Sequence, residues 1–243
     1  MHIIKLNATD STNSYLRQLC NDVLVADYTA VIANKQTQGR GQMGTVWDSQ
    51  ESKSLTFSVY KDISVFDLEN PFHISIVTSL AIIKTLKGLS INKLSIKWPN
   101  DILSENKKIC GILIENVIKQ GKFANSIIGI GLNVNQLAFD NLPQASSLRI
   151  VSGRVYDLDE VAHAVVKNLK YYFNMLKKGE LDKLKSKYEN CLFRKNKPST
   201  FKDAEGNMFS GFIKSVSDSG CLQVLLEDSI LKEFEFKTIT LLY

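Results

Sequence analysis

The sequence is poor in the residue types on which several enzyme classes depend. It has only three histidines, His2, His73 and His163, and their scatter argues against a catalytic triad or a histidine-rich metal site. Its four cysteines are too widely spaced for a CxxC zinc or redox motif, so we expect them to be reduced and mostly buried. Chemistry that needs a side-chain nucleophile is therefore not indicated.

Long apolar runs are also absent. No segment approaches the roughly 20 apolar residues that a membrane-spanning helix needs. The first residues, MHIIKLNATDSTN, lack the apolar segment and the small-residue cleavage site of a secretory signal. The composition, with 44% hydrophobic and 23% charged residues, is that of a globular protein with a sizeable core. We expect a cytoplasmic protein without membrane contact.

Basic residues exceed acidic ones, 30 to 25, which gives a net charge of +5. Many of the lysines fall within residues 167–197. The simplest interpretation is a solvated helix face, and the alternative is a docking surface for an acidic partner. Nucleic acid is disfavoured because aromatic residues are not interleaved with these charges.

Hydrophobic periodicity predicts a mixed chain of helices and strands. We expect helices over 10–20, 71–87, from Asp157 onward, and over 180–192, and strands over 30–36, 54–60, 94–98, 109–118 and 126–134. From residue 196 onward, short β-rich runs are separated by turns such as DAEGN and SDSG, which is typical of a small antiparallel barrel or meander. The predicted domains are 1–195 and 196–243.

Two of these strands have faces of contrasting composition. In 126–134, alternation gives one apolar face and one face of small or polar residues, Gly129, Gly131, Asn133 and Asn135. Glycines on a strand face pack poorly, so this face suits a ligand that lies against bare backbone. In 109–118, we expect one face to carry Ile109, Gly111, Leu113 and Glu115.

Residues 39–44, GRGQMG, match the dinucleotide-binding pattern GxGxxG. That interpretation requires a helix directly after the loop, with its N-terminus facing the pyrophosphate. The residues that follow, TVWDSQESKS, lead into another strand with no helical stripe. We therefore reject a dinucleotide site. What remains is a glycine loop with one cation, Arg40, and one flat apolar side chain, Trp47.

Several segments together resemble biotin protein ligases. The combination of GRG…W, KWPND and K-x-x-G-I-L is far more specific than any one element. The order and spacing agree over roughly 11–135, and the β-rich tail is similar to the family's C-terminal domain. The matching residues are Ser11-Thr12-Asn13, Gln36, Gly39-Arg40-Gly41, Trp47, Lys97-Trp98-Pro99-Asn100-Asp101, Lys108, Gly111 and Gly129-Ile130-Gly131-Leu132-Asn133.

The resemblance implies an α+β fold. A mixed, largely antiparallel sheet flanked by helices, similar to class II synthetases, would precede a small SH3-like barrel. It also implies a two-step reaction. Biotin would be activated by ATP and Mg²⁺ to biotinyl-5′-AMP, and then transferred to a lysine of a biotin carboxyl carrier protein or domain. The expected partners are thus ATP, biotin and a carrier protein. A homodimer formed through exposed sheet edges is a further expectation.

The resemblance also assigns site residues, although not the metal ligands. The catalytic residues would be Lys108, Arg40 and Asp101. Biotin would be bound by Ser11, Thr12, Asn13, Gln36, Gly39, Arg40, Gly41, Gln42, Lys108, Gly111, Gly129 and Gly131. ATP would be bound by Trp47, Asn133, Lys108 and Asn100.

The glycine loop departs from the commonest family pattern at two positions. Gln42 and Thr45 stand where arginines are frequent. We expect weaker electrostatic retention of the adenylate as a result. The N-terminus also departs from repressor-type members, since only ten residues precede Ser11. We therefore expect no helix-turn-helix domain and no DNA binding.

Two alternatives stay open from the sequence. A lipoate–protein ligase or lipoyl transferase would share the fold and the acyl-adenylate chemistry, although the R-R-x-x-G-G-G-A pattern is missing. A non-catalytic binding module would need only the glycine loops, and the presence of both Arg40 and Lys108 argues against it.

Overall fold

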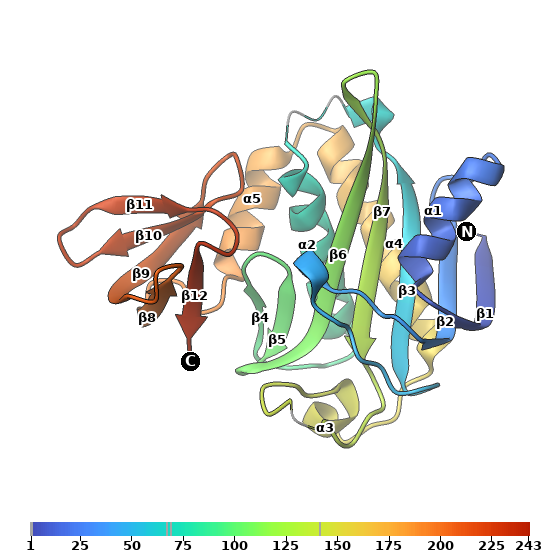
Figure 1. Ribbon diagram of the computed structural model, residues 1–243, viewed down its shortest axis with the longest axis horizontal. Helices are drawn as coiled ribbons and strands as arrows, with labels where there is room; N and C mark the ends of the chain where they lie inside the picture. The colour runs from blue at the N-terminus through green and yellow to red at the C-terminus, as the bar shows by residue number, and fades with distance from the viewer. Residues whose placement is uncertain (1, 67, 69, 141) are drawn as a thin grey trace.

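A seven-stranded sheet forms the centre of the molecule (Figure 1). The computed structural model describes residues 2–66, 68, 70–140 and 142–243. Within them the strands are ordered β1-β2-β3-β7-β6-β5-β4. The pair β1–β2 is parallel, and every other pair is antiparallel. The expected mixed, largely antiparallel sheet is confirmed.

The strands of this sheet are β1 (Ile3–Thr9), β2 (Ala30–Gln36), β3 (Ser54–Asp62), β4 (Leu94–Lys97), β5 (Asp101–Ser104), β6 (Lys107–Lys119) and β7 (Lys122–Asn133). The helices are α1 (Thr12–Asp22), α2 (Phe72–Gly88), α3 (Leu148–Ser152), α4 (Leu158–Lys177) and α5 (Leu181–Asn190), with short 3₁₀ turns η1 (Gln42–Gly44) and η2 (Ser64–Phe66).

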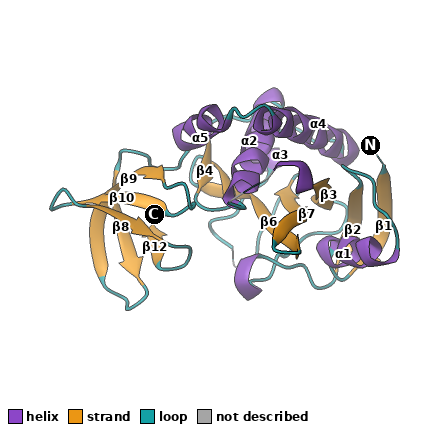
Figure 2. Cartoon of the chain, turned by 90° about the horizontal axis from the view of Figure 1, so that it is seen from above, coloured by secondary structure: helices purple, strands orange, loops and turns teal. Residues whose placement is uncertain are grey.

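The two faces of the sheet are covered differently. Figure 2 shows α2 and α4 on one side and α1 on the other. The main core lies between the sheet and α2 and α4, and it includes Phe57, Ile128 and Ile130. A smaller apolar cluster of Leu16, Val31 and Ile127 lies beneath α1. The apolar face predicted for residues 126–134 therefore packs in the core, and its glycine face points to the α1 side.

Sequence signals located α1, α2, α4 and α5, whereas the short helix α3 was not predicted. Helix α2 follows Pro71, and α4 begins after Asp157, whose side chain accepts a hydrogen bond from the Glu160 N–H (2.9 Å). The cap of α1 is different, because Ser11 occupies the N-cap position without a side-chain capping hydrogen bond. Ser11 is instead buried at the start of the helix, facing a cavity.

Three features of the strands also differ from the sequence-based expectation. Strand β1 was not predicted, because its half-exposed edge position leaves little hydrophobic alternation. The strand expected at 94–98 ends at Lys97, and β5 follows as a second strand of a hairpin. Ile109 does not share a face with Gly111, because a register shift in the β5–β6 pair places Ile109 in the main core.

A second, five-stranded antiparallel sheet follows α5, ordered β11-β10-β9-β8-β12. Its strands are β8 (Pro198–Asp203), β9 (Met208–Val216), β10 (Leu222–Leu226), β11 (Leu231–Phe234) and β12 (Ile239–Leu242). This sheet fits the expected SH3-like unit. The division of the chain into 1–195 and 196–243 stays a prediction.

The turn between β9 and β10 fixes the second sheet against the first. The Trp98 indole Nε1 donates to the carbonyl of Gly220 (2.9 Å), and Asn70 donates to the carbonyl of Asp218 (2.5 Å). Gly220 has a φ of +91°, and a Cβ there would lie 2.5 Å from Cγ of Phe72. Only glycine combines that backbone conformation with such close packing.

The four cysteines were expected to be mostly buried. Only Cys110 is fully buried, and Cys20, Cys191 and Cys221 are partly exposed. The cysteines are free thiols, and burial raises the pKa of Cys110. Among the described residues, no helix is both long and apolar enough to cross a lipid bilayer.

Replacing Gly220 with alanine should weaken the docking of the second sheet. A matched control is Gly206→Ala, since Gly206 has a similar φ of +95° but a Cβ there would lie 3.7 Å from its nearest neighbour, Cε of Lys202. We expect Gly206→Ala to lower the free energy of unfolding by about 1 kcal/mol through backbone strain alone. Gly220→Ala should cost about 1–3 kcal/mol more through overpacking against Phe72. Urea denaturation measures both, and equal losses would contradict the docking role.

Candidate functional site

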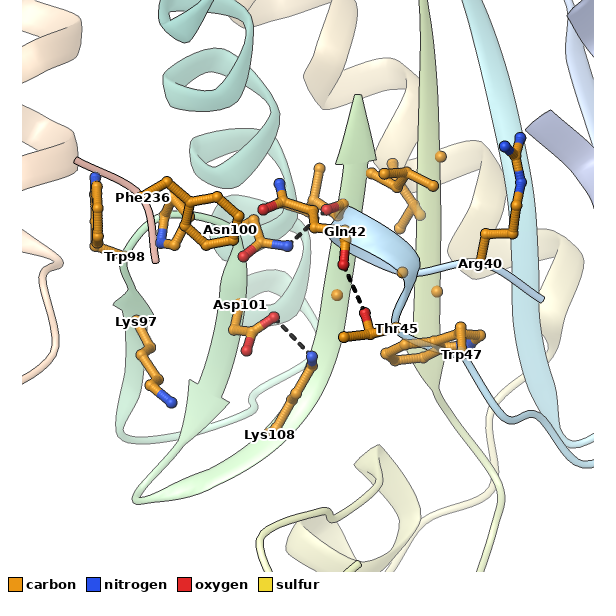
Figure 3. A pocket seen from close by; sticks show the side chains of 18 of the residues that line it. Arg40, Gln42, Thr45, Trp47, Lys97, Trp98, Asn100, Asp101, Lys108 and Phe236 are labelled. Atoms are coloured by element: carbon orange, nitrogen blue, oxygen red, sulfur yellow. Dashed lines mark hydrogen bonds and ion pairs between the residues drawn. The ribbon is translucent and has the colours of Figure 1, made fainter. Parts of the chain in front are cut away.

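A cavity of about 600 Å³ lies on the α1 side of the sheet. Its walls come from α1, the loop after β2, the β4–β5 hairpin, β6, β7 and the second sheet (Figure 3). Most of the sequence-predicted site residues line it, namely Ser11, Thr12, Asn13, Gln36, Arg40, Gly41, Gln42, Trp47, Asn100, Asp101, Lys108, Gly111, Gly129 and Gly131. Gly39 and Asn133 lie outside this lining.

An ion pair stands at the centre of the cavity. Nζ of Lys108 lies 2.8 Å from Oδ1 of Asp101, and both side chains are largely covered, with exposed fractions of 35% and 19%. Asp101 is held by the tight β4–β5 turn, in which the Trp98–Pro99 peptide is cis. Asn100 fastens this turn to β6, because its Nδ2 donates to the carbonyl of Ile112 (2.8 Å) and its carbonyl accepts the Ile112 N–H (3.0 Å).

The β6 bulge determines where Lys108 points. Lys108 and Gly111 are three residues apart, so a regular strand would place them on opposite faces. The register shift opposite Ile102 and Leu103 adds one residue to β6 and brings Lys108 to the face of Gly111. The ammonium group therefore reaches Asp101 inside the cavity.

A second lysine stands close to this pair. Lys97 is the cross-strand partner of Asp101, and its ammonium group lies 4.7 Å from the centre of the Tyr243 ring. Burial lowers the pKa of Lys97, a trend that Asp101 opposes and Lys108 reinforces. The centre of the cavity thus has two lysines and one carboxylate, an excess of positive charge suited to an anionic ligand.

Two glycines form a bare floor beside the ion pair. Gly111 and Gly131 are direct cross-strand partners in β6 and β7. The indole of Trp47 lies on them, since a Cβ would be 2.8 Å from Cζ3 of Trp47 at Gly111 and 2.3 Å from Cε2 at Gly131. Nζ of Lys108 is 5.5 Å from the centre of the same indole. Trp47 therefore occupies the surface that the sequence assigned to biotin.

The glycine loop closes on itself. The Gly41 N–H donates to the carbonyl of Thr45 (2.6 Å), and the Trp47 N–H donates to the carbonyl of Gly39 (2.9 Å). A Cβ at Gly39 would lie 2.3 Å from the Trp47 carbonyl oxygen, which explains the glycine at that position. Oε1 of Gln42 is buried and, among the residues described, has no hydrogen-bond partner.

Arg40 points away from the Asp101–Lys108 pair (Figure 3). Its Nη2 lies 3.3 Å from Oε2 of Glu115. Nδ2 of Asn13 donates to the same oxygen (2.8 Å), and Nη2 of Arg17 lies 3.3 Å from the other oxygen of Glu115. Arg40 and Lys108 thus both line the cavity, but the structure does not bring them together.

Polar side chains at the end of the cavity beneath α1 form a connected network. The Thr12 N–H donates to Oε1 of Gln36 (2.8 Å), and the hydroxyl of Thr12 also donates to it (3.1 Å). The Ser58 hydroxyl lies 2.7 Å from Oγ1 of Thr12 and 2.5 Å from Oδ1 of Asn13. A Cβ at Gly129 would lie 2.5 Å from Oδ1 of Asn13, so this glycine makes room for the network.

The side chain of Asn133 is held by hydrogen bonds to other residues of the protein. Its Nδ2 donates to the carbonyl of Ser146 (3.0 Å), and its Oδ1 accepts from Nε2 of Gln136 (3.3 Å). The side chain is 5% exposed. Asn133 therefore anchors the loop after β7, and its predicted contact with adenine stays a prediction.

Several residues in or next to the cavity were not predicted as part of the site. Ser58 and Glu115 contact Thr12 and Asn13, which line the cavity, but neither belongs to a motif. The second sheet contributes Phe236 and Lys237 to the cavity, with Phe236 6.1 Å from Trp98 between ring centres. No local sequence signal reports such a contact, because the two segments are more than 130 residues apart.

The described residues include no cluster of three or more histidine, cysteine, aspartate or glutamate side chains suited to a metal ion. Asp101 is the one carboxylate among the residues that line the described cavity. A single carboxylate is compatible with Mg²⁺, which commonly binds through one or two carboxylates and the phosphates of a substrate.

Comparison with known proteins identifies relatives of this chain. It is 34% identical over 161 residues to the bifunctional ligase/repressor BirA of Bacillus spizizenii, a match that covers 64% of this chain and 49% of the relative. It is 29% identical over 164 residues to the biotin–[acetyl-CoA-carboxylase] ligase of Mycobacterium tuberculosis, covering 66% of this chain and 60% of the relative. The match thus spans about half the length of the Bacillus protein.

A solved structure of biotin protein ligase from Aquifex aeolicus in complex with biotin and ATP superposes with a TM-score of 0.83 at 28% identity. The superposition covers 99% of this chain and 98% of that one. The model of the biotin/lipoate A/B protein ligase family matches residues 6–133, more than half of the chain. The family-level prediction from the motifs is confirmed, and the chain belongs to the biotin/lipoate A/B protein ligase family.

Proposed function

We propose that this protein activates biotin with ATP to biotinyl-5′-AMP and then transfers biotin to a lysine of a biotin carboxyl carrier domain. The observation that carries the proposal is the convergence of the GRG loop, the KWPND turn, Lys108 and the glycine-rich β7 face around one cavity. Membership of the family and the likeness to a biotin ligase with bound biotin and ATP support it.

In the first step, a carboxylate oxygen of biotin attacks the α-phosphorus of ATP. The bond between that phosphorus and the bridging oxygen breaks, and pyrophosphate leaves. Lys108 and Lys97 would hold the negative charge that both reactants bring to the centre of the cavity, an electrostatic role that accounts for much of catalysis in such displacements. Asp101 would orient Lys108 through their ion pair (2.8 Å).

In the second step, the amine nitrogen of the carrier lysine attacks the carbonyl carbon of the anhydride. AMP leaves with the bonding electrons, the amine loses a proton and an amide forms. The network of Thr12, Asn13, Gln36 and Ser58 would hold the biotin ring, and Trp47 would stack on adenine. Gly129, which has no side chain, would leave room for Asn13 in this network.

Mg²⁺ would be carried chiefly by the phosphates of ATP, with Asp101 as the protein ligand. When bound, it would reduce the repulsion between the phosphates and the incoming carboxylate. The residues of this chain would position biotin and ATP for the reaction.

The proposal predicts label on the carrier lysine when the protein is incubated with ATP, Mg²⁺, radiolabelled biotin and a biotin carrier domain. Parallel reactions with labelled lipoate and a lipoyl domain test the alternative within the same family. Labelling with biotin at a rate far above that with lipoate is expected. Preference for lipoate would overturn the substrate, and no labelling in either reaction would favour the non-catalytic module.

Lys108→Ala should lower the rate of biotinyl-adenylate formation by about 100- to 1,000-fold, the range for removing one charge-stabilising group. The matched control is Lys107→Ala, because Lys107 instead donates to the carbonyl of Pro143 and lies outside the cavity lining. Pyrophosphate release measures the first step. Retained turnover in Lys108→Ala would assign the main cationic role to another residue, such as Lys97.

Gln42→Arg should slow the release of biotinyl-adenylate by about fivefold, a factor that corresponds to about 1 kcal/mol for a partly exposed charge pair. Gln42 lines the cavity, whereas Gln38 in the same loop does not, so Gln38→Arg controls for the added charge. Chase of labelled adenylate with unlabelled biotin gives the release rate. Equal release from Gln42→Arg and the parent would refute the idea that Gln42 weakens retention.

A further inference from the structure

Glu115 is the meeting point of three donors from two distant segments. Asn13 and Arg17 come from α1, and Arg40 comes from the glycine loop. Glu115 lies on β6, two and four residues beyond Leu113 and Gly111, on the face that forms the cavity floor. Its side chain is 20% exposed, so its charge is partly shielded from water.

Of the three donors, only Arg40 lies outside α1, in the glycine loop. Asn13 is 2% exposed, is 2.5 Å from the hydroxyl of Ser58 and also donates to the carbonyl of Leu113 (3.3 Å). Arg17 sits within α1. Arg40 is flanked by two glycines, and its side chain is 45% exposed. A change in the loop would therefore release Arg40 from Glu115 while the other two contacts stay.

The position of Arg40 on Glu115 separates it from the reacting end of the cavity. Figure 3 shows the guanidinium directed away from Asp101 and Lys108. Among the residues 38–47 it is the one cation. Because both Gln42 and Thr45 are uncharged, the charge that the loop can offer to an anionic ligand depends on this single side chain.

The geometry points to Glu115 as a positioning residue that holds Arg40 in the ligand-free protein. An anionic ligand in the cavity competes with Glu115 for the guanidinium. When the ligand binds the guanidinium more strongly than Glu115 does, Arg40 moves to the ligand. Glu115 stays bound to Asn13 and Arg17, so the ring-binding network keeps its shape. The identity of the anion, the biotin carboxylate, rests on the proposed function. The contact between Glu115 and Arg40 in the ligand-free protein does not depend on the proposed function.

Glu115→Gln tests this proposal, because glutamine keeps an oxygen that accepts from Asn13 but has no charge to hold Arg40. Trypsin cleavage after Arg40, measured by mass spectrometry without ligand, reports how often the loop leaves Glu115. Cleavage after Lys119, the exposed last residue of β6, is the internal reference. We expect relative cleavage at Arg40 to rise about three- to fivefold, the range for a partly exposed ion pair.

Arg17→Gln is the matched control, since it removes the other ion pair of Glu115 without touching the loop. Cleavage at Arg40 should stay at the parent level. Unchanged cleavage in Glu115→Gln, or an equal rise in Arg17→Gln, would overturn the proposal. If Glu115→Gln fails to fold, the parent protein in about 1 M salt, where the Debye length is about 3 Å, should show the same rise relative to Lys119. No rise there would overturn the proposal as well.

Ligand binding separates this role from a merely structural one. Glu115→Gln should bind biotin about three- to fivefold more tightly than the parent, because Arg40 no longer has to leave a counter-ion. Biotin methyl ester has no carboxylate, so its affinity should not change. Equal gains for both ligands would overturn the competition. If the parent binds neither ligand, the proposed function fails, and the cleavage comparison alone decides the role of Glu115.

Discussion

Gly111 and Gly131 face each other across β6 and β7, and the indole of Trp47 lies where their side chains would be. This bare pair sets the positions of the other parts of the site. Asp101 is in register with Gly111, Asn100 fastens the KWPND turn to the next residue of β6, and the bulge turns Lys108 to the same face. A larger residue at either glycine would move Trp47 and, with it, the loop that bears Arg40.

The same strands serve stability and binding through opposite faces. Ile128 and Ile130 pack in the main core, whereas Gly129 and Gly131, which alternate with them, form the floor of the cavity. Because side chains alternate along a strand, a shift of one residue in register would exchange these faces. The buried apolar face thus fixes the register on which the cavity depends. The stability of the core and the geometry of the site are set by one constraint.

Much of this arrangement was predictable from local sequence. Alternation in 126–134 predicted the glycine face, and the KWPND and GRG motifs located part of the cavity lining, including Arg40, Trp47 and Asp101. Three things were not predictable, because each depends on contacts with another segment of the chain. The bulge that reverses the face of Ile109 depends on pairing with β5. The polar contacts of Asn133 depend on the loop that follows β7. The wall that contains Phe236 depends on how the second sheet docks.

The glycine loop is anchored at both of its ends, and the two anchors differ in kind. At Trp47 the anchor is apolar contact with the glycine floor, which is not sensitive to salt. At Arg40 it is an ion pair with a partly exposed carboxylate, which is weak and can be exchanged for another anion. A ligand that carries both a flat ring and a negative charge can replace both anchors at once. A ligand with only one of these features replaces one and leaves the other in place. The loop therefore favours, by its construction, a ligand that combines a ring system with an acidic group.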